Sequence, residues 1–279
     1  MELGSAELAI LDRLLEARTG QQLNDSRYWR VARAVESIMR SHGFRDTDAL
    51  FALLTSKSGY EVATQIVEAM VNNETSFFRD ATMFKQLRNL LADTLTEKGS
   101  PRPYRIWSAG CSTGQEPYSL AIMLGEMPHL PGRKIDIVAT DISGGAIDRA
   151  REGLYSQFEI QRGLSVRAMI RDFSQEDEKW RIRDKLRESV TFREHNLLEP
   201  QAAGPFDLIL CRNVLFYFPM ATRAKVLSHL RDALAPAGTL ILGAGETLIG
   251  LANGLDKIDG GYGFYRLHSE ERRDIAVGG

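Results

Sequence analysis

The chain has 279 residues, with 35 lysines and arginines against 37 aspartates and glutamates, which gives a formal net charge of −2. Hydrophobic residues make up 43% and charged residues 26%, an ordinary globular composition that suits one large or two modest domains. The near-neutral total argues against a dedicated nucleic-acid binder. No run approaches the ~20 apolar residues of a membrane span. Cys111 and Cys211 cannot form a disulfide framework, so we expect a cytoplasmic protein.

The N-terminal part of the chain carries apolar side chains at helical spacing and no strand pattern. The expected helices span residues 6–17, 27–43, 49–54, 61–71 and 81–91. In the second of these, Val31 and Val35 lie on an apolar face, with Arg30, Arg33 and Arg40 on the opposite face and Arg27 at its edge. We therefore predict an all-helical domain over residues 1–91 that presents one basic helix face.

After a turn-rich linker at residues 92–103, short apolar runs alternate with helical patterns. Strands are expected at residues 104–109, 134–140, 190–194, 206–210, 239–242 and 264–267, and helices at 115–126, 145–152 and 221–234. This alternation predicts a doubly wound α/β domain with a mostly parallel sheet covered by helices on both faces. A polar stretch before residue 190 interrupts the alternation, and we expect an exposed loop at Ser174–Lys179 within it.

A glycine-containing loop follows the first predicted strand, at Gly110-Cys111-Ser112-Thr113-Gly114. Gly110 and Gly114 allow a sharp turn and a close approach of a ligand to the backbone, at the edge of the sheet where α/β proteins bind their ligands. A tight turn with no ligand is the alternative. The loop lacks the complete G-x-G-x-x-G pattern, and the chain contains no G-x-x-x-x-G-K-[ST], so a diphosphate cradle is disfavoured.

Asp141 ends the second predicted strand. An acid at this position can accept hydrogen bonds from both ribose hydroxyls of a nucleoside, although it could instead cap the helix that follows. Glycine loop and acid together indicate a nucleoside cofactor without separating NAD from S-adenosylmethionine. The missing phosphate-binding glycines favour S-adenosylmethionine, which has no phosphate to bind.

Polar side chains also follow the third and fourth predicted strands. Asn196 and Leu197 could frame an adenine, and a buried strand leads abruptly into Arg212 and Asn213, residues that are costly to bury unpaired. The five histidines are scattered and no H-E-x-x-H spacing occurs, so we expect no metal.

Five motifs occur in order along the chain: NNETSFFRD (72–80), WSAGCSTGQEPYS (107–119), ATDIS (139–143), FDLILCRNVLFYF (206–218) and GYGFYR (261–266). Together they closely resemble the CheR family, the chemotaxis protein methyltransferases that esterify receptor glutamates with S-adenosylmethionine. The resemblance implies an all-helical N-terminal domain, a linker, and a class I S-adenosylmethionine methyltransferase domain. That domain would span residues 104–268, with a small β-subdomain inserted at 157–189 and a flexible tail at 269–279.

The resemblance also implies a site. The residues that would bind the cofactor are Asn73, Thr75, Arg79, Gly110, Glu116, Asp141, Asn196, Leu197, Asn213 and Val214. Glu116 would contact the methionine portion and Asp141 the ribose, with Asn196 and Leu197 beside the adenine. S-adenosylhomocysteine would be the product, and no metal is implied.

Arg79 and Tyr217 occupy the positions that the family associates with catalysis. A glutamate carboxylate is ionised near pH 7, since its reference pKa is about 4.3, so the reaction needs no strong general base. Alignment of the reacting atoms and desolvation of the carboxylate remain, and an Arg and a Tyr able to hold a carboxylate suit both.

The implied partners are the cytoplasmic helices of chemoreceptors, met by a monomer that binds no nucleic acid and does not insert into the membrane. Five arginines against Glu36 between residues 27 and 45 make a basic region suited to an acidic helical target, with Arg27, Arg30, Arg33 and Arg40 as candidate recognition residues. The inserted subdomain lacks the glycine-rich loop of relatives that bind a receptor's C-terminal pentapeptide, so we expect activity without pentapeptide tethering.

Other functions stay open at this point. They are a methyltransferase with another substrate, a non-catalytic module that binds S-adenosylmethionine or S-adenosylhomocysteine, and a nicotinamide dehydrogenase. One departure also concerns the site: many relatives carry a G-H-S-E-like segment after the fifth strand, where this chain has Gly243-Ala244-Gly245-Glu246-Thr247.

Overall fold

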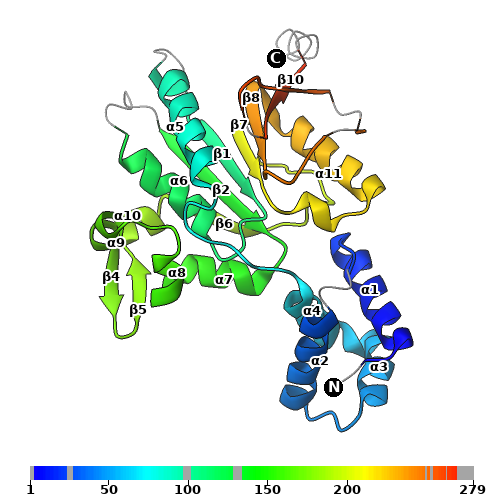
Figure 1. The fold of residues 1–279 in the computed structure, drawn as a ribbon. Coiled ribbons are helices and arrows are strands. Elements are labelled where there is room, and N and C mark those ends of the chain that lie inside the picture. Colours follow the sequence, from blue (N-terminus) through cyan, green and yellow to red (C-terminus); the bar gives the residue numbers. More distant parts are fainter. Residues whose placement is uncertain are drawn as a thin grey trace. The chain divides into compact units, whose positions relative to one another are not determined.

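The computed structural model describes residues 3–23, 28–96, 102–127, 134–248, 250–251, 254–261 and 263–268. The chain divides into two compact units (Figure 1). The first comprises Met1–Asn72 and Phe216–Arg223, and the second comprises Asn73–Leu215 and Ala224–Gly279. Arg27 and the predicted tail at 269–279 lie outside the described residues.

The first unit is built from helices, as predicted. They are α1 (Ser5–Thr19), α2 (Tyr28–His42), α3 (Thr47–Leu54), the short 3-10 helix η2 (Lys57–Gly59) and α4 (Tyr60–Met70). The Asp46 side chain starts α3 by accepting a hydrogen bond from the Ala49 amide. The helices pack around fully buried Leu11, Val35 and Ile66, so the apolar face of each amphipathic helix points into one shared core.

The second unit is built around a seven-stranded sheet in the order β6-β2-β1-β7-β8-β10-β9. Its strands are β1 (Tyr104–Ala109), β2 (Ile135–Asp141), β6 (Val190–Glu194), β7 (Phe206–Cys211), β8 (Leu234–Leu242), β9 (Leu255–Lys257) and β10 (Phe264–Leu267). The first five are parallel to one another, whereas β10 pairs antiparallel with both β8 and β9. This is the class I methyltransferase arrangement, and the predicted fold class is confirmed.

Four longer helices accompany the sheet: α5 (Ala81–Thr96), α6 (Gln115–Gly125), α7 (Gly144–Glu152) and α11 (Met220–Asp232). In Figure 1, α5 and α6 lie on one side of the sheet and α11 on the other. We expected α5 in the helical domain, but the chain divides after Asn72. The reason is that Met83, Leu87 and Leu91 of α5 are buried in the same core cluster as the strands of the second unit.

An inserted subdomain follows α7. It contains the three-stranded sheet β3-β5-β4, formed by β3 (Leu154–Ser156), β4 (Phe173–Glu176) and β5 (Lys179–Ile182), together with α8 (Gln157–Gln161), α9 (Val166–Asp172) and α10 (Asp184–Arg187). The expected exposed loop at Ser174–Lys179 is instead the end of a hairpin. Gln175 pairs with Trp180, and Asp177 takes a left-handed conformation (φ 52°) in the turn.

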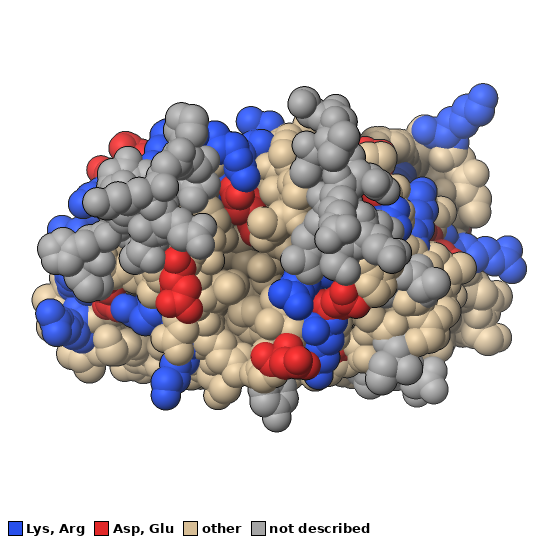
Figure 2. All heavy atoms as spheres, turned by 90° about the horizontal axis from the view of Figure 1, so that it is seen from above, with Lys and Arg blue, Asp and Glu red and all other residues tan. Residues whose placement is uncertain are grey.

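Charged side chains of both signs are mixed on one face of the molecule. On the face shown in Figure 2, blue Lys and Arg atoms alternate with red Asp and Glu atoms, and neither sign covers it. No helix within the described ranges has the length and apolarity that crossing a membrane would require.

Candidate active site

The loop after β1 turns sharply at the carboxyl edge of the sheet. Gly110 and Gly114 have φ values of 78° and 94°, and the backbone amides of Gly110 and Cys111 both donate to the carbonyl of Thr140 on β2. A Cβ on Gly110 would lie 2.5 Å from Cγ2 of Val214, so only glycine permits this close contact with the loop after β7. Two of the predicted cofactor residues are therefore packed against each other.

Asp141 lies at the end of β2 with its carboxylate fixed by backbone amides. Oδ2 accepts from Ser112 N at 2.8 Å and Oδ1 from Ser143 N at 3.0 Å. The alternative role as a helix cap is wrong, because Ser143 caps α7 by accepting from Ala146 N. Burial raises the pKa of the Asp141 carboxyl, and the hydrogen bonds from Ser143, Ser112 and Ile142 oppose that rise.

The segment from Asn73 to Asp80 is held against the rest of the second unit by contacts along its length. Ser112 Oγ donates to the Asn73 carbonyl at 2.8 Å, and Phe78 N donates to Ser119 Oγ at 2.8 Å. Phe77 between them is buried against the aromatic rings of the inserted subdomain. Thr75 and Arg79 are half-buried in the same segment, so these predicted residues lie on one well-anchored stretch of chain.

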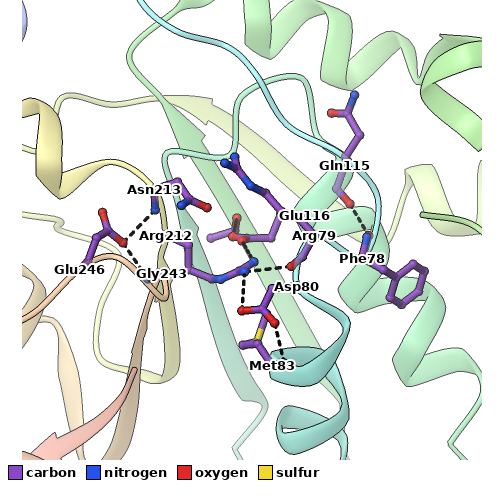
Figure 3. A network of polar contacts seen from close by, with 12 residues as sticks. Phe78, Arg79, Asp80, Met83, Gln115, Glu116, Arg212, Asn213, Gly243 and Glu246 are labelled. Atoms are coloured by element: carbon purple, nitrogen blue, oxygen red, sulfur yellow. Dashed lines mark hydrogen bonds and ion pairs between the residues drawn. The ribbon is translucent and has the colours of Figure 1, made fainter. Parts of the chain in front are cut away.

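Glu116, in the first turn of α6, belongs to a buried charge network (Figure 3). Its Oε1 accepts from Ser108 Oγ at 2.8 Å and its Oε2 from Arg212 NH1 at 3.0 Å. Arg212 NH2 also donates to the backbone carbonyl of Arg79 at 2.9 Å. Two predicted site residues from distant parts of the chain thus share one guanidinium.

The loop after β7 is held by a second charged side chain, Glu246. Its Oε2 accepts from the amides of Asn213 and Gly243 at 2.9 and 2.7 Å (Figure 3). Its Oε1 accepts from the amides of Val214 and Leu215 at 2.8 and 2.7 Å. Asn213 has a φ of 61°, a conformation that this set of hydrogen bonds stabilises. The segment Gly243–Thr247, which differs from the G-H-S-E-like segment of many relatives, therefore supplies the carboxylate that holds this loop.

Asn196 and Leu197 follow β6, next to the β2 edge. The amide of His195 donates to the Asp141 carbonyl, and Asn196 Oδ1 accepts from Leu198 N at 3.0 Å. Leu197 is buried. These contacts place both predicted residues directly beside the strand end that carries the Asp141 carboxylate.

Tyr217, the second predicted catalytic residue, falls in the first unit. Its hydroxyl accepts from Asn72 Nδ2 at 2.6 Å, and its carbonyl accepts from Gln22 N at 3.0 Å. Asn72 Oδ1 in turn accepts from Arg30 NH1 at 2.6 Å. One amide side chain therefore joins the predicted catalytic tyrosine to a predicted recognition arginine.

The basic face of α2 is exposed as predicted for Arg30, Arg33 and Arg40. The guanidinium carbons of Arg30 and Arg33 lie 5.5 and 5.4 Å from the ring centre of Trp29, which is itself 57% exposed. Trp29, Arg30, Arg33, Ala34, Ala69 and Val71 line a shallow hollow of about 350 Å³. Within the described ranges no acidic side chain forms an ion pair with Arg30, Arg33 or Arg40.

Arg212 and Glu246 are two buried polar residues of the site to which the sequence analysis assigned no role. The abrupt step from a buried strand to Arg212 was a usable signal, because a buried arginine requires acceptors. Glu246 had a weaker signal, an acid four residues beyond a strand end. Cys111 and Cys211 are fully buried thiols whose pKa values burial raises well above the ordinary range. The described residues contain no group of His, Cys, Asp and Glu that could hold a metal ion.

The sheet order, the glycine loop and the buried acid ending β2 define an S-adenosylmethionine-dependent methyltransferase. Comparison with known proteins narrows this class. The family model "CheR methyltransferase, SAM binding domain" matches residues 73–263. The chain is 36% identical over 262 residues to the chemotaxis protein methyltransferase of Vibrio anguillarum, covering 92% of this chain and 94% of that one.

It is also 33% identical over 257 residues to chemotaxis protein methyltransferase Cher2 of Pseudomonas putida, covering 90% of this chain and 94% of that one. The chain belongs to the CheR methyltransferase family.

Proposed function

We propose that this protein methylates glutamate side chains on the cytoplasmic helices of chemoreceptors, as a protein-glutamate O-methyltransferase. The observation that carries the proposal is the exposed arginine face of α2, for which the described residues form no ion pair with an acidic side chain. Relatives named chemotaxis protein methyltransferases support the receptor as the substrate.

The residues fit S-adenosylmethionine, because two fixed carboxylates match a ligand with ribose hydroxyls and an amino group. Asp141 would accept from the ribose, and Glu116 would meet the methionine amino group. Asn196 and Leu197 lie next to Asp141, where an adenine extends from the ribose, and Asn213 and Val214 would close the pocket. Asn73, Thr75, Arg79 and Gly110 complete the proposed cofactor set.

When bound, the cofactor would supply a methyl group on a sulfonium sulfur, and the neutral thioether that remains after transfer is a good leaving group. The protein's part is then to present an ionised carboxylate in the correct direction and to remove water from it. Arg79 provides a cation for this carboxylate. Tyr217 provides a hydroxyl that donates to it. Neither has to remove a proton, in keeping with the substrate's low pKa.

The α2 face is the proposed recognition surface for the receptor. Arg30 and Arg33 stand beside the exposed Trp29 ring and edge a hollow, so a helix with glutamates and small apolar residues could place both kinds of side chain there. Arg40 would extend the positive surface along the helix, and Arg27 is the fourth proposed recognition residue. Because these charges are exposed to solvent, they should contribute mainly to the rate of association with the receptor, and that rate should depend on ionic strength.

We further propose that the enzyme is a cytoplasmic monomer and that it works without a receptor pentapeptide. The pentapeptide proposal is supported by the short inserted hairpin, whose turn consists of Asp177 and Glu178 rather than a glycine-rich loop. Calorimetry with such a peptide should give no micromolar binding.

Incubation with labelled S-adenosylmethionine and receptor cytoplasmic fragments tests the proposal. We expect label on the receptor that alkali releases as methanol, and none when the receptor's methylation-site glutamates are changed to alanine. Binding of S-adenosylhomocysteine without any transfer would instead indicate a non-catalytic module. Transfer of label to other acceptors alone would indicate another substrate.

A further inference from the structure

Arg212 is the most completely buried charged side chain of the site. It follows β7, and only 3% of its side chain is accessible to solvent. A buried cation is costly unless it is paired and hydrogen-bonded. The partners that it has found therefore indicate what it does.

Those partners come from separate segments of the second unit. NH1 binds the carboxylate of Glu116 at 3.0 Å, on the first turn of α6. NH2 binds the Arg79 carbonyl at 2.9 Å and lies 3.7 Å from Oδ2 of Asp80. Asp80 in turn caps α5, since its Oδ1 accepts from Met83 N. Figure 3 shows Glu116 and Asp80 on opposite sides of the guanidinium and the Arg79 side chain pointing away from it.

We propose that Arg212 is a positioning residue that fixes the proposed cofactor-binding carboxylate of Glu116 and the backbone of the proposed catalytic residue Arg79 relative to each other. This inference rests on the function proposed above. Arg212 acts through these two residues and does not itself contact the substrate. One planar fork can hold two acceptors at a fixed separation, which an ammonium group cannot do.

The proposal predicts two separate effects, one for each arm of the fork. Loss of the Glu116 arm frees a carboxylate that should meet the cofactor, so cofactor affinity falls. Loss of the Arg79 arm lets the backbone at Arg79 move, so kcat falls even when cofactor is saturating. A residue that only stabilised the fold would lower the unfolding temperature without this pattern.

The first test is Arg212→Lys, which keeps the charge and removes the fork. We expect calorimetry to show about tenfold weaker binding of S-adenosylhomocysteine, and kcat to fall about tenfold at saturating S-adenosylmethionine. Arg171→Lys is the matched control, because Arg171 also binds two carboxylates, Asp172 and Glu126, outside the site. It should change neither quantity by more than about twofold. Unchanged affinity and kcat in Arg212→Lys would overturn the proposal.

A double-mutant cycle with Glu116→Gln measures whether Arg212 acts through Glu116. If it does, the double variant binds S-adenosylhomocysteine no more than about twofold more weakly than the weaker of the two single variants. Losses that multiply would mean that the two residues act independently, and would contradict the proposal.

Glu116→Gln alone keeps the idea testable if Arg212→Lys does not fold, as judged by circular dichroism. Because the amide holds the guanidinium less firmly, kcat at saturating cofactor should also fall about threefold. A raised KM for S-adenosylmethionine with unchanged kcat would exclude the coupling. The calorimetric results stand even if wild-type protein forms no receptor esters, so failure of the proposed function would be recognised separately.

Discussion

A buried arginine in the second unit and two exposed arginines in the first show how the environment of an arginine determines what it can bind. Arg212 in the second unit is buried and meets carboxylates and a carbonyl within the protein. Arg30 and Arg33 in the first unit are exposed and make cation–π contacts with the Trp29 ring. Arg30 also donates a hydrogen bond to the neutral amide of Asn72. A buried cation must be satisfied from within, whereas an exposed cation with neutral partners keeps its charge available to a partner. The buried group should therefore govern cofactor binding and catalysis, and the exposed group should govern substrate recognition.

The largest effect is expected at Arg79, whose backbone carbonyl accepts a hydrogen bond from Arg212. Arg79→Ala should lower kcat/KM for receptor methylation about hundredfold, because it removes a cation proposed to hold the reacting carboxylate. Arg88→Ala, which removes the surface ion pair between Arg88 of α5 and Glu126 at the end of α6, is the control and should have little effect. Steady-state methylation assays measure both. An Arg79→Ala enzyme with wild-type kcat/KM would remove Arg79 from the mechanism.

Glu246→Gln tests whether the buried carboxylate of Glu246 holds the loop after β7. The amide nitrogen would face two backbone N–H groups that now donate to a carboxylate oxygen, so the free energy of unfolding should fall by about 2 kcal/mol. Binding of S-adenosylhomocysteine should weaken with it, since Asn213 and Val214 lose their anchor. Urea unfolding and calorimetry report the two quantities. The exposed hairpin substitution Glu178→Gln should alter neither, and equal stability of the two variants would contradict the assigned role.

Reversing charge on the exposed arginines should weaken use of the receptor and spare cofactor binding. The double variant Arg30→Glu and Arg33→Glu should raise KM for the receptor fragment about tenfold and make methylation less sensitive to salt. Binding of S-adenosylhomocysteine should stay within about twofold of wild type, because both residues lie outside the second unit. If methylation were unaffected, another surface would have to select the receptor.

The smallest expected effect concerns pH. Burial raises the pKa of Asp141 above that of an ordinary aspartate, and the ribose hydroxyls require the ionised carboxylate. Cofactor affinity should therefore fall, about threefold, as pH is lowered from about 7 to about 5, while the Asp141 contribution to the stability of the free protein moves the other way. Calorimetry across this range measures the slope. Asp141→Asn should bind weakly with a flat profile, and a wild-type slope in that variant would point to a different titrating group.

Local sequence patterns were sufficient to locate the parts of the site that depend on residues close together in the chain. The glycines of the loop after β1 and the acid ending β2 could be placed because strand, turn and helix follow one another within the same stretch of chain. The hairpin at Phe173–Ile182 was missed because its polar residues show no alternation. The assignment of α5 to the first unit was wrong, because apolar spacing predicts a helix without saying which core that helix joins.

The network around Arg212 and Glu246 could not be derived in this way. Arg212 and Glu116 are 96 residues apart, and Tyr217 and Asn72 are 145 apart. Contacts at such separations are fixed by sheet order and loop geometry, which a single sequence does not contain. Composition concealed a further feature, because a net charge of −2 averages over a basic helix face and a balanced remainder.

The division of labour between the two arginine groups is tested most directly by two-substrate kinetics on Arg212→Lys and on the Arg30→Glu, Arg33→Glu double variant. KM would be measured for S-adenosylmethionine and for the receptor fragment in each. We predict that Arg212→Lys raises KM for the cofactor and leaves that for the receptor near wild type, and that the double variant does the reverse. The same KM changing in both variants, or both changing in each, would contradict the account.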